Sequence, residues 1–145
     1  MEGIVVSINI SERKGERKKP VGMARITMEG IEGDAHAGKW HRQISLLAEE
    51  SIEKMREKGM KISYGDFAEN ITTKGINLAE LEVGQRLKIG NEVIIEVTQI
   101  GKKCHDDCEI KRLTGECVMP KEGIFARVIE EGIIKEGDKI VVEGK

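Results

Sequence analysis

The sequence predicts a mostly-β fold, a small closed β-barrel with one main helix and short helical turns. Three observations predict it: many short β-branched segments, a single substantial helical pattern, and no regular alternation of strands with helices. The chain of 145 residues is long enough for one self-sufficient core, and no linker or low-complexity segment divides it. We therefore expect one domain over residues 1–145.

Short runs of Val, Ile and Leu separated by Gly-containing turns are expected as strands. They lie at residues 4–10, 21–28, 44–47, 71–73, 86–89, 93–100, 124–129, around 134, and 140–142. The helix is expected at residues 48–58, where Ile52 and Met55 fall at helical spacing and Gly59 ends the pattern. Only 3% of residues are aromatic, so the core has to be aliphatic.

Charge and hydropathy exclude several function classes. A net charge of −2 gives no global basic surface for nucleic acid or an anionic membrane. No apolar run approaches the roughly 18 residues of a membrane helix, and the first residues resemble a strand rather than a signal peptide. Three cysteines without a secretion signal indicate free thiols in a reducing cytoplasm.

The densest group of reactive side chains follows the strongest predicted strand. Cys104 is flanked there by Lys102, Lys103, His105 and Asp106. Neighbouring cations promote the thiolate, which is the nucleophilic and metal-binding form, but the acidic neighbours oppose this effect. The sequence therefore predicts a functional thiol without fixing the direction of its pKa shift.

Three interpretations of the cysteines remain open. They fill space in the core, or they form a structural zinc site, or one thiolate carries sulfur or binds a soft metal. The zinc ligands would be drawn from Cys104, Cys108 and Cys117 with His105 or His41. Their spacing is poor for zinc, because the adjacent residues 104 and 105 do not readily face one ion.

The glycine-rich loop at residues 30–38 is the second candidate site. Closely spaced glycines let backbone N–H groups approach an anion, and His36, His41 and Arg42 would add side-chain contacts to a phosphate or polar heterocycle. A purely structural turn is the alternative, and the two histidines form a metal pair only if the loop folds them together.

Three further features have a structural and a functional interpretation. Asp66, Glu69 and Asn70 form either a capped turn or a binding cluster. The basic run at residues 11–19 is either a solvated loop or an anion-attracting rim. Arg127 lies within an apolar strand, where it is either exposed or paired with a fixed anion.

Taken together and in order, six segments resemble the MOSC family, the domain found at the C-terminus of molybdenum cofactor sulfurases and as small stand-alone proteins. They are residues 33–38 (GDAHAG), 41–47 (HRQISLL), 65–71 (GDFAENI), 81–84 (LEVG), 96–101 (EVTQIG) and 123–128 (GIFARV). The resemblance spans about residues 3–142, nearly the whole chain.

The resemblance implies a β-barrel similar to the small barrel of pyruvate kinases and a link to molybdenum cofactor. It places Cys104 at the family's characteristic cysteine, which ligates molybdenum in some members and is proposed to carry a persulfide in others. The residues that it implies for binding the cofactor's pterin and phosphate and balancing its charge are Asp34, His36, Gly38, His41, Arg42, Asn70, Lys102 and Arg127.

The sequence also departs from the family. The surroundings of Cys104, Lys-Lys-Cys-His-Asp-Asp-Cys, differ from those in reductase-type relatives, so Cys117 is an alternative functional thiol or a second member of a donor–acceptor pair. The chain has no pyridoxal-phosphate module, and sulfur would have to come from a cysteine desulfurase or another cofactor-biosynthesis protein. Two rival functions are a molybdenum-dependent reductase of N-hydroxylated compounds and a non-catalytic module that docks onto biosynthetic enzymes.

Overall fold

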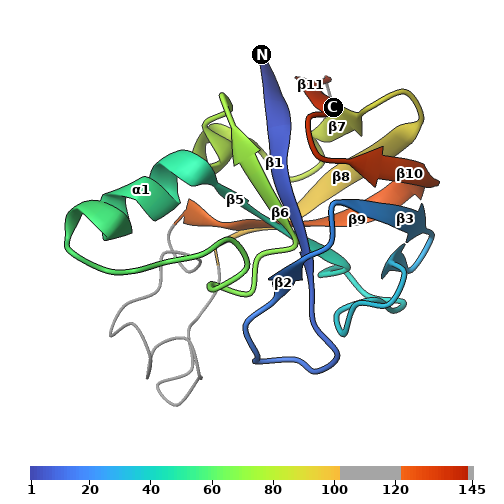
Figure 1. Ribbon diagram of the computed structural model, residues 1–145. Helices are drawn as coiled ribbons and strands as arrows, with labels where there is room; N and C mark the ends of the chain where they lie inside the picture. The colour runs from blue at the N-terminus through green and yellow to red at the C-terminus, as the bar shows by residue number, and fades with distance from the viewer. Residues whose placement is uncertain (102–121, 144–145) are drawn as a thin grey trace.

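The computed structural model describes residues 1–101 and 122–143 (Figure 1). Its elements in chain order are β1 (Glu2–Ile10), β2 (Lys19–Pro20), β3 (Met23–Thr27), β4 (Gly30–Ile31), β5 (Ile44–Ala48), α1 (Glu49–Glu57), β6 (Ile71–Lys74), the 3-10 helix η1 (Leu78–Glu80), β7 (Arg86–Ile89), β8 (Val93–Ile100), β9 (Ile124–Glu130), β10 (Gly132–Lys135) and β11 (Lys139–Val142).

Within the described part of the chain, seven strands close into a barrel, as the sequence predicts. The circuit runs β1–β11–β7–β8–β9–β5–β6 and returns to β1. Neighbouring strands are antiparallel except β5 and β6, which are parallel and therefore need the longer connection that contains α1. Closure leaves these strands with partners on both sides and forms a continuous interior.

The barrel interior is aliphatic, as the low aromatic content requires. All seven barrel strands contribute to it, with fully buried side chains such as Ile8, Ile44, Ile71, Ile95 and Ile140. A second, smaller cluster joins α1 to the outside of the barrel and includes the helix residues Ile52 and Met55 with Phe67 and Phe125. The helix therefore forms because one face of it is buried against the sheet.

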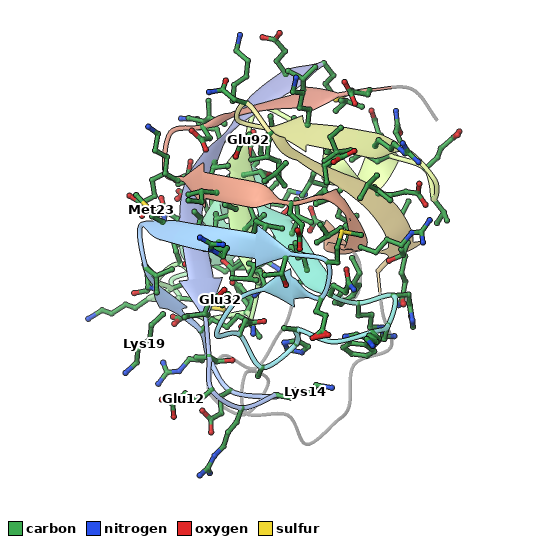
Figure 2. The ribbon with its side chains drawn as sticks, turned by 90° about the vertical axis from the view of Figure 1, so that its right-hand side faces the viewer. Glu12, Lys14, Lys19, Met23, Glu32 and Glu92 are labelled. Carbon is green, nitrogen blue, oxygen red and sulfur yellow. The ribbon has the colours of Figure 1, made fainter. Side chains whose placement is uncertain are left out.

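A small sheet of β10, β3 and β4 lies against the barrel (Figure 2). Its buried residues Ile26, Ile31 and Ile134 join the main core. The β1–β2 loop, which carries Glu12 and Lys14, extends from the lower end of the molecule in this view. The two-residue strands β2 and β4 were not expected, because so short a segment shows no periodic pattern.

A pairing irregularity lies at the end of β8. Val97 pairs with Ala126 of β9, but Gln99 pairs with the next residue back, Phe125, so Thr98 is the extra residue of a β-bulge. Bulges redirect side chains and are common beside functional sites. Here the bulge at Thr98 lies three residues before Gly101, which is the last described residue before position 122.

The described residues contain no helix that is long and apolar enough to cross a membrane.

Candidate functional site

The first polar cluster, called here the Lys18 group, consists of Ser11, Lys18, Asp34 and His36. Lys18 Nζ lies 2.7 Å from Asp34 Oδ1, 2.9 Å from His36 Nδ1 and 3.1 Å from Ser11 Oγ. The side chains of Lys18 and Asp34 are fully buried, whereas 20% of the His36 side chain remains exposed. The cluster joins the β1–β2 loop to the glycine-rich loop.

Four of the five basic residues in the loop at residues 11–19 are exposed, as the interpretation of a solvated loop expects, and the buried Lys18 is the exception. Its backbone N–H donates to Gly65 O at 2.8 Å, and Gly65, at φ +92°, lies so close that a Cβ there would be 2.2 Å from Lys18 O. This backbone contact between distant loops draws Lys18 inward while its neighbour Lys19 stays exposed. A run of five basic residues gives no sign of which one is buried.

The positive charge of Lys18 lowers the pKa of the Asp34 carboxyl. Burial by itself raises the pKa of this carboxyl, but the hydrogen bond and positive charge of Lys18, with hydrogen bonds from Asn70 and the Ser11 backbone, outweigh it. The pKa of Asp34 is therefore below its usual value, and the carboxylate is ionised at neutral pH. Its second oxygen accepts the His36 backbone N–H at 3.1 Å.

The second cluster, the Gln99 group, consists of His41, Arg42 and Gln99. Gln99 Oε1 lies 2.9 Å from Arg42 Nε and 3.1 Å from His41 Nε2, and Gln99 Nε2 donates to Gly101 O at 2.7 Å. The bulge at the end of β8 gives Gln99 this position. His41 and Arg42 were predicted from the sequence, whereas Gln99 was not singled out as a site residue although it belongs to the EVTQIG segment.

Trp40 connects the two clusters. Its ring stacks on His36 with centroids 6.2 Å apart and meets the His41 ring edge-on at 5.9 Å. Its Nε1 donates to His36 O at 2.8 Å, and Lys14 Nζ lies 4.3 Å from the centroid of its ring. The three rings therefore form one continuous polar and aromatic surface along residues 36–41.

Asn70 is part of a buried network rather than an exposed binding cluster. Its Oδ1 accepts Ser45 N at 2.9 Å, and its Nδ2 donates to Asn9 O at 3.1 Å. Beside it, Glu69 Oε2 accepts hydrogen bonds from Gly65 N and the Thr72 hydroxyl. A hydrogen bond from Asn70 also lowers the pKa of Asp34, so this buried network is connected to the Lys18 group.

Burial raises the pKa of Glu69, although backbone and hydroxyl donors lower it in part. The residue before it, Ala68, has φ +62°, a left-handed conformation that is rare for alanine. This conformation turns the GDFAENI loop so that Glu69 and Asn70 both face inward.

Gly38 and Arg127 have local structural partners. Gly38 N donates to Glu29 O at 2.7 Å, and Gly38 O accepts Gln43 Nε2 at 2.8 Å. Arg127 lies on the outer wall of the barrel, half exposed, with its guanidinium 3.0 Å from Glu96 Oε1. Arg127 is therefore both exposed and paired with a fixed anion, so the two interpretations each describe it in part, and its membership of a cofactor site stays a prediction.

Lys102, Cys104 and Cys117, with Cys108 and His105 of the zinc hypothesis, lie outside the described residues. In residues 1–101 and 122–143 no group of three or more His, Cys, Asp or Glu side chains is placed to hold a metal ion. The predicted thiol and metal roles therefore stay predictions.

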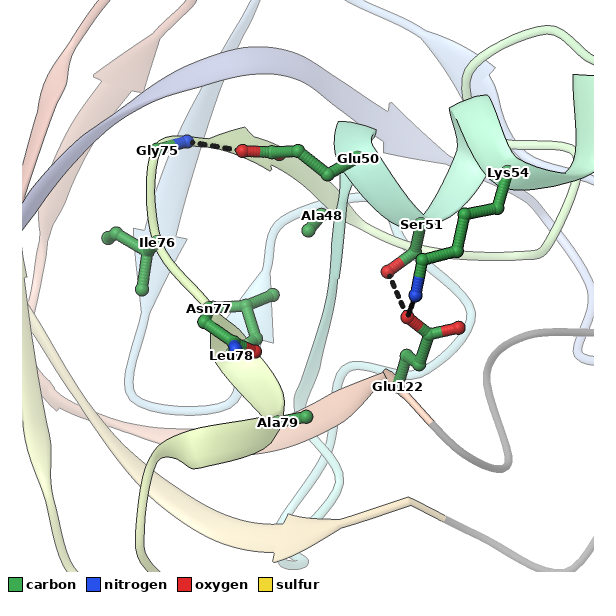
Figure 3. A pocket seen from close by; sticks show the side chains of 10 residues that line it. All are labelled: Ala48, Glu50, Ser51, Lys54, Gly75, Ile76, Asn77, Leu78, Ala79 and Glu122. Atoms are coloured by element: carbon green, nitrogen blue, oxygen red, sulfur yellow. Dashed lines mark hydrogen bonds and ion pairs between the residues drawn. The ribbon is translucent and has the colours of Figure 1, made fainter. Parts of the chain in front are cut away.

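Two surface pockets lie away from the centre of these clusters. One, of about 440 Å³, touches the Lys18 group only through Ser11 and is otherwise lined by Ile10, Glu12, Glu16, Arg17, Lys19 and Gly33. The other, of about 310 Å³, lies between α1 and the β6–η1 segment (Figure 3). There Glu122 accepts hydrogen bonds from Ser51 and Lys54, and none of the described residues selected from the sequence lines it.

The sequence matches the model of the MOSC domain family over residues 33–141, about three-quarters of the chain. The chain belongs to the MOSC domain family. The match includes the part of the Lys18 group on the glycine-rich loop and all of the Gln99 group. No curated protein sequence matches the chain at a significant level.

Solved structures share this fold. YuaD from Bacillus subtilis has a TM-score of 0.83 at 19% identity, over 100% of this chain and 97% of that one. YiiM from Geobacillus stearothermophilus has a TM-score of 0.74 at 22% identity, over 97% and 75% of the two chains. YiiM from Escherichia coli has a TM-score of 0.72 at 18% identity, over 100% and 71%.

Proposed function

We propose that this MOSC domain handles molybdenum cofactor during its maturation. Polar residues of the Lys18 and Gln99 groups hold the anionic part of a molybdopterin-type cofactor, and a thiol from residues 102–121 binds the metal or carries sulfur. The observation that carries the proposal is the hydrogen bond from Gln99 Nε2 to Gly101 O, because it places the Gln99 group where the chain enters the segment that contains all three cysteines. The ring contacts of Trp40 link this group to the Lys18 group.

The donor set of the described residues fits an anionic ligand. A phosphate is best held by cations and N–H donors. Arg42 supplies a guanidinium with four N–H groups besides the one bonded to Gln99, and His36 supplies a ring N–H group. The ring N–H of His41 is donated to Gln99 Oε1. Asp34, the one carboxylate in the two clusters, is neutralised by Lys18 at 2.7 Å and presents no uncompensated negative charge.

The thiol role rests on chain connectivity. Cys104 follows Gly101 by three residues, which limits the distance between their Cα atoms to about 11 Å. A molybdenum cofactor, when bound, would supply a soft metal whose coordination a thiolate completes. The remaining candidates for binding and charge balance are Gly38, Lys102 and Arg127, and Cys117 is the alternative thiol. Asn70, the other predicted residue, would act on the ligand only through its buried network beside Asp34.

In the sulfur-carrying form of the proposal, the Cys104 thiolate attacks the outer sulfur of a persulfide on a donor protein. A new S–S bond forms at Cys104 and the donor's thiolate leaves, so no external oxidant is needed. A cysteine desulfurase is the chemical class of donor that supplies such a persulfide. We place this exchange in the reducing cytoplasm, as the free thiols indicate.

Mass spectrometry of the intact protein and measurement of its molybdenum content test the proposal. Protein purified from a host that makes the cofactor should carry a mass increase of one sulfur atom or should contain molybdenum. Cys104→Ser should abolish the signal, whereas Cys108→Ser is the matched control and should retain it. A wild-type protein with neither signal after incubation with a desulfurase and its cysteine substrate would overturn the proposal.

If Cys117→Ser abolishes the signal and Cys104→Ser does not, the functional thiol is Cys117.

A further inference from the structure

The contact between Lys18 and His36 determines where the histidine carries its proton. Lys18 Nζ lies 2.9 Å from His36 Nδ1, and the two groups form a hydrogen bond. An ammonium has three N–H groups and no lone pair, so it can only donate. Asp34 Oδ1 at 2.7 Å stabilises Lys18 in this charged form. His36 Nδ1 is therefore the acceptor and carries no proton.

The other charged groups that the described residues place near the ring, Asp34 and Lys14, do not reverse this assignment. Asp34 Oδ2 is 3.8 Å from His36 Nδ1, beyond hydrogen-bond distance, and already accepts the His36 backbone N–H. Lys14 Nζ lies over the ring of Trp40, which is stacked on His36. This second positive charge also opposes protonation of His36. A doubly protonated His36 would direct an N–H at the Lys18 ammonium, which repulsion opposes.

We propose that Lys18 is a positioning residue that holds His36 as the neutral tautomer with its proton on Nε2. In this form His36 donates a hydrogen bond to an anionic oxygen of the bound ligand. Its Nε2 has no lone pair to accept a proton or to bind a metal ion. Stacking on Trp40, at an interplanar angle of 4°, fixes the ring plane in which that N–H lies. Only the identity of the ligand rests on the proposed function.

Nitrogen-15 NMR of the full-length protein with labelled histidines, without any ligand, tests the tautomer directly. The His36 signals are assigned by their loss in His36→Gln. We expect Nδ1 in the unprotonated range and Nε2 in the protonated range at neutral pH. A proton on Nδ1, alone or together with one on Nε2, at neutral pH would overturn the inference.

Lys18→Met should allow His36 to take up a second proton on Nδ1, because the opposing ammonium is gone and the Asp34 carboxylate lies 3.8 Å away. Lys19→Met, a change at the exposed neighbour, is the matched control and should leave the His36 spectrum unchanged. A His36 spectrum that is identical in folded Lys18→Met and in the wild type would contradict the positioning role. Should Lys18→Met fail to fold, the wild-type spectrum still decides the tautomer.

Two substitutions of His36 test its role as a donor. A glutamine amide nitrogen reaches the position of Nε2, whereas an asparagine amide reaches only that of Nδ1. We expect His36→Gln to retain most of the bound molybdenum and organic phosphate and His36→Asn to lose about tenfold in affinity, the worth of one such hydrogen bond. Equal retention by both variants would contradict the donor role. If the wild type retains no cofactor, the proposed function fails, while the NMR spectrum still decides the present inference.

Discussion

Two ion pairs of the same formal chemistry, one between loops and one on the barrel wall, lie in opposite surroundings. The Lys18–Asp34 pair is fully buried, with an Nζ–Oδ1 distance of 2.7 Å. The Arg127–Glu96 pair lies on the outer wall between β8 and β9, with an N–O distance of 3.0 Å and half of the arginine exposed. Water and salt screen the outer pair but not the inner one.

The comparison shows that burial and neighbouring hydrogen-bond partners, rather than the two charges alone, decide how much an ion pair contributes to local geometry and stability. The inner pair cannot separate without leaving an unpaired charge in the interior, so it fixes the geometry of Ser11 and His36 around it. The outer pair shares Glu96 with Arg86, and together they lower the pKa of Glu96 although its burial opposes this. We expect the inner pair to support the site and the outer pair to contribute little.

The largest effect is expected from Lys18→Met. Removal of the cation leaves the Asp34 carboxylate buried without its counter-charge, which costs about 3–5 kcal/mol of unfolding free energy. Urea unfolding followed by circular dichroism measures the loss. Lys19→Met is the control, because this neighbouring side chain is exposed and its loss should cost at most about 0.5 kcal/mol. A loss below about 1 kcal/mol in Lys18→Met would contradict the importance of the buried pair.

Asp34→Asn should destabilise the protein by about 3 kcal/mol at neutral pH, with a characteristic pH dependence. The pKa of Asp34 is lower in the folded protein than its value of about 3.9 in the unfolded chain. Its stabilisation is therefore present above about pH 4 and is lost as the pH falls through the lower folded value. Unfolding free energies of wild type and variant should differ by a constant amount from about pH 5 to 8 and converge in acid.

A difference between Asp34→Asn and wild type that grows in acid would contradict this sign. Glu12→Gln, on the exposed β1–β2 loop, provides a control with the same loss of one carboxylate.

Gly65→Ala disturbs the buried pair through the backbone alone. The new Cβ would lie 2.2 Å from Lys18 O, so the two loops would have to separate. Gly59→Ala is the matched control, because Gly59 has the same φ of +92° but nothing lies within 4 Å of its Cβ position. We expect Gly65→Ala to be less stable than Gly59→Ala by about 2 kcal/mol in thermal or urea unfolding. Equal losses would show that the contact between the loops is dispensable.

Thr73→Val extends the comparison to a buried polar atom without a partner. Thr73 Oγ1 is the one such side-chain atom in the described residues, so its removal should stabilise the protein by about 1 kcal/mol. Thr72→Val is the control with the opposite sign, because Thr72 Oγ1 accepts from Asn9 Nδ2 and donates to Glu69 Oε2. Unfolding free energies that fall by the same amount in both variants would contradict this account.

Arg127→Ala should have the smallest effect, below about 1 kcal/mol, because solvent already screens its pair with Glu96. The difference from wild type should shrink further as the salt concentration rises. Urea unfolding at low and high salt measures both. A loss as large as that of Lys18→Met, or one that is independent of salt, would remove the distinction between the two pairs.

The sequence by itself determined the fold class and half of the candidate site. Spaced β-branched runs predicted the barrel because alternation along a strand is a local property. Glycine spacing and the nearby histidines likewise pointed to His36, His41 and Arg42, and the family resemblance added Asp34. The structure divides these four residues between the two clusters.

Only the tertiary structure decided which basic residue is buried and which side chains the clusters add. Lys18 stands among five similar cations, and its burial depends on a contact with Gly65, 47 residues further along the chain. Gln99 reaches Arg42 because of a β-bulge that depends on the pairing of β8 with β9. Contacts between segments distant in the sequence determine both positions, and hydrophobic periodicity does not indicate which distant segments pair.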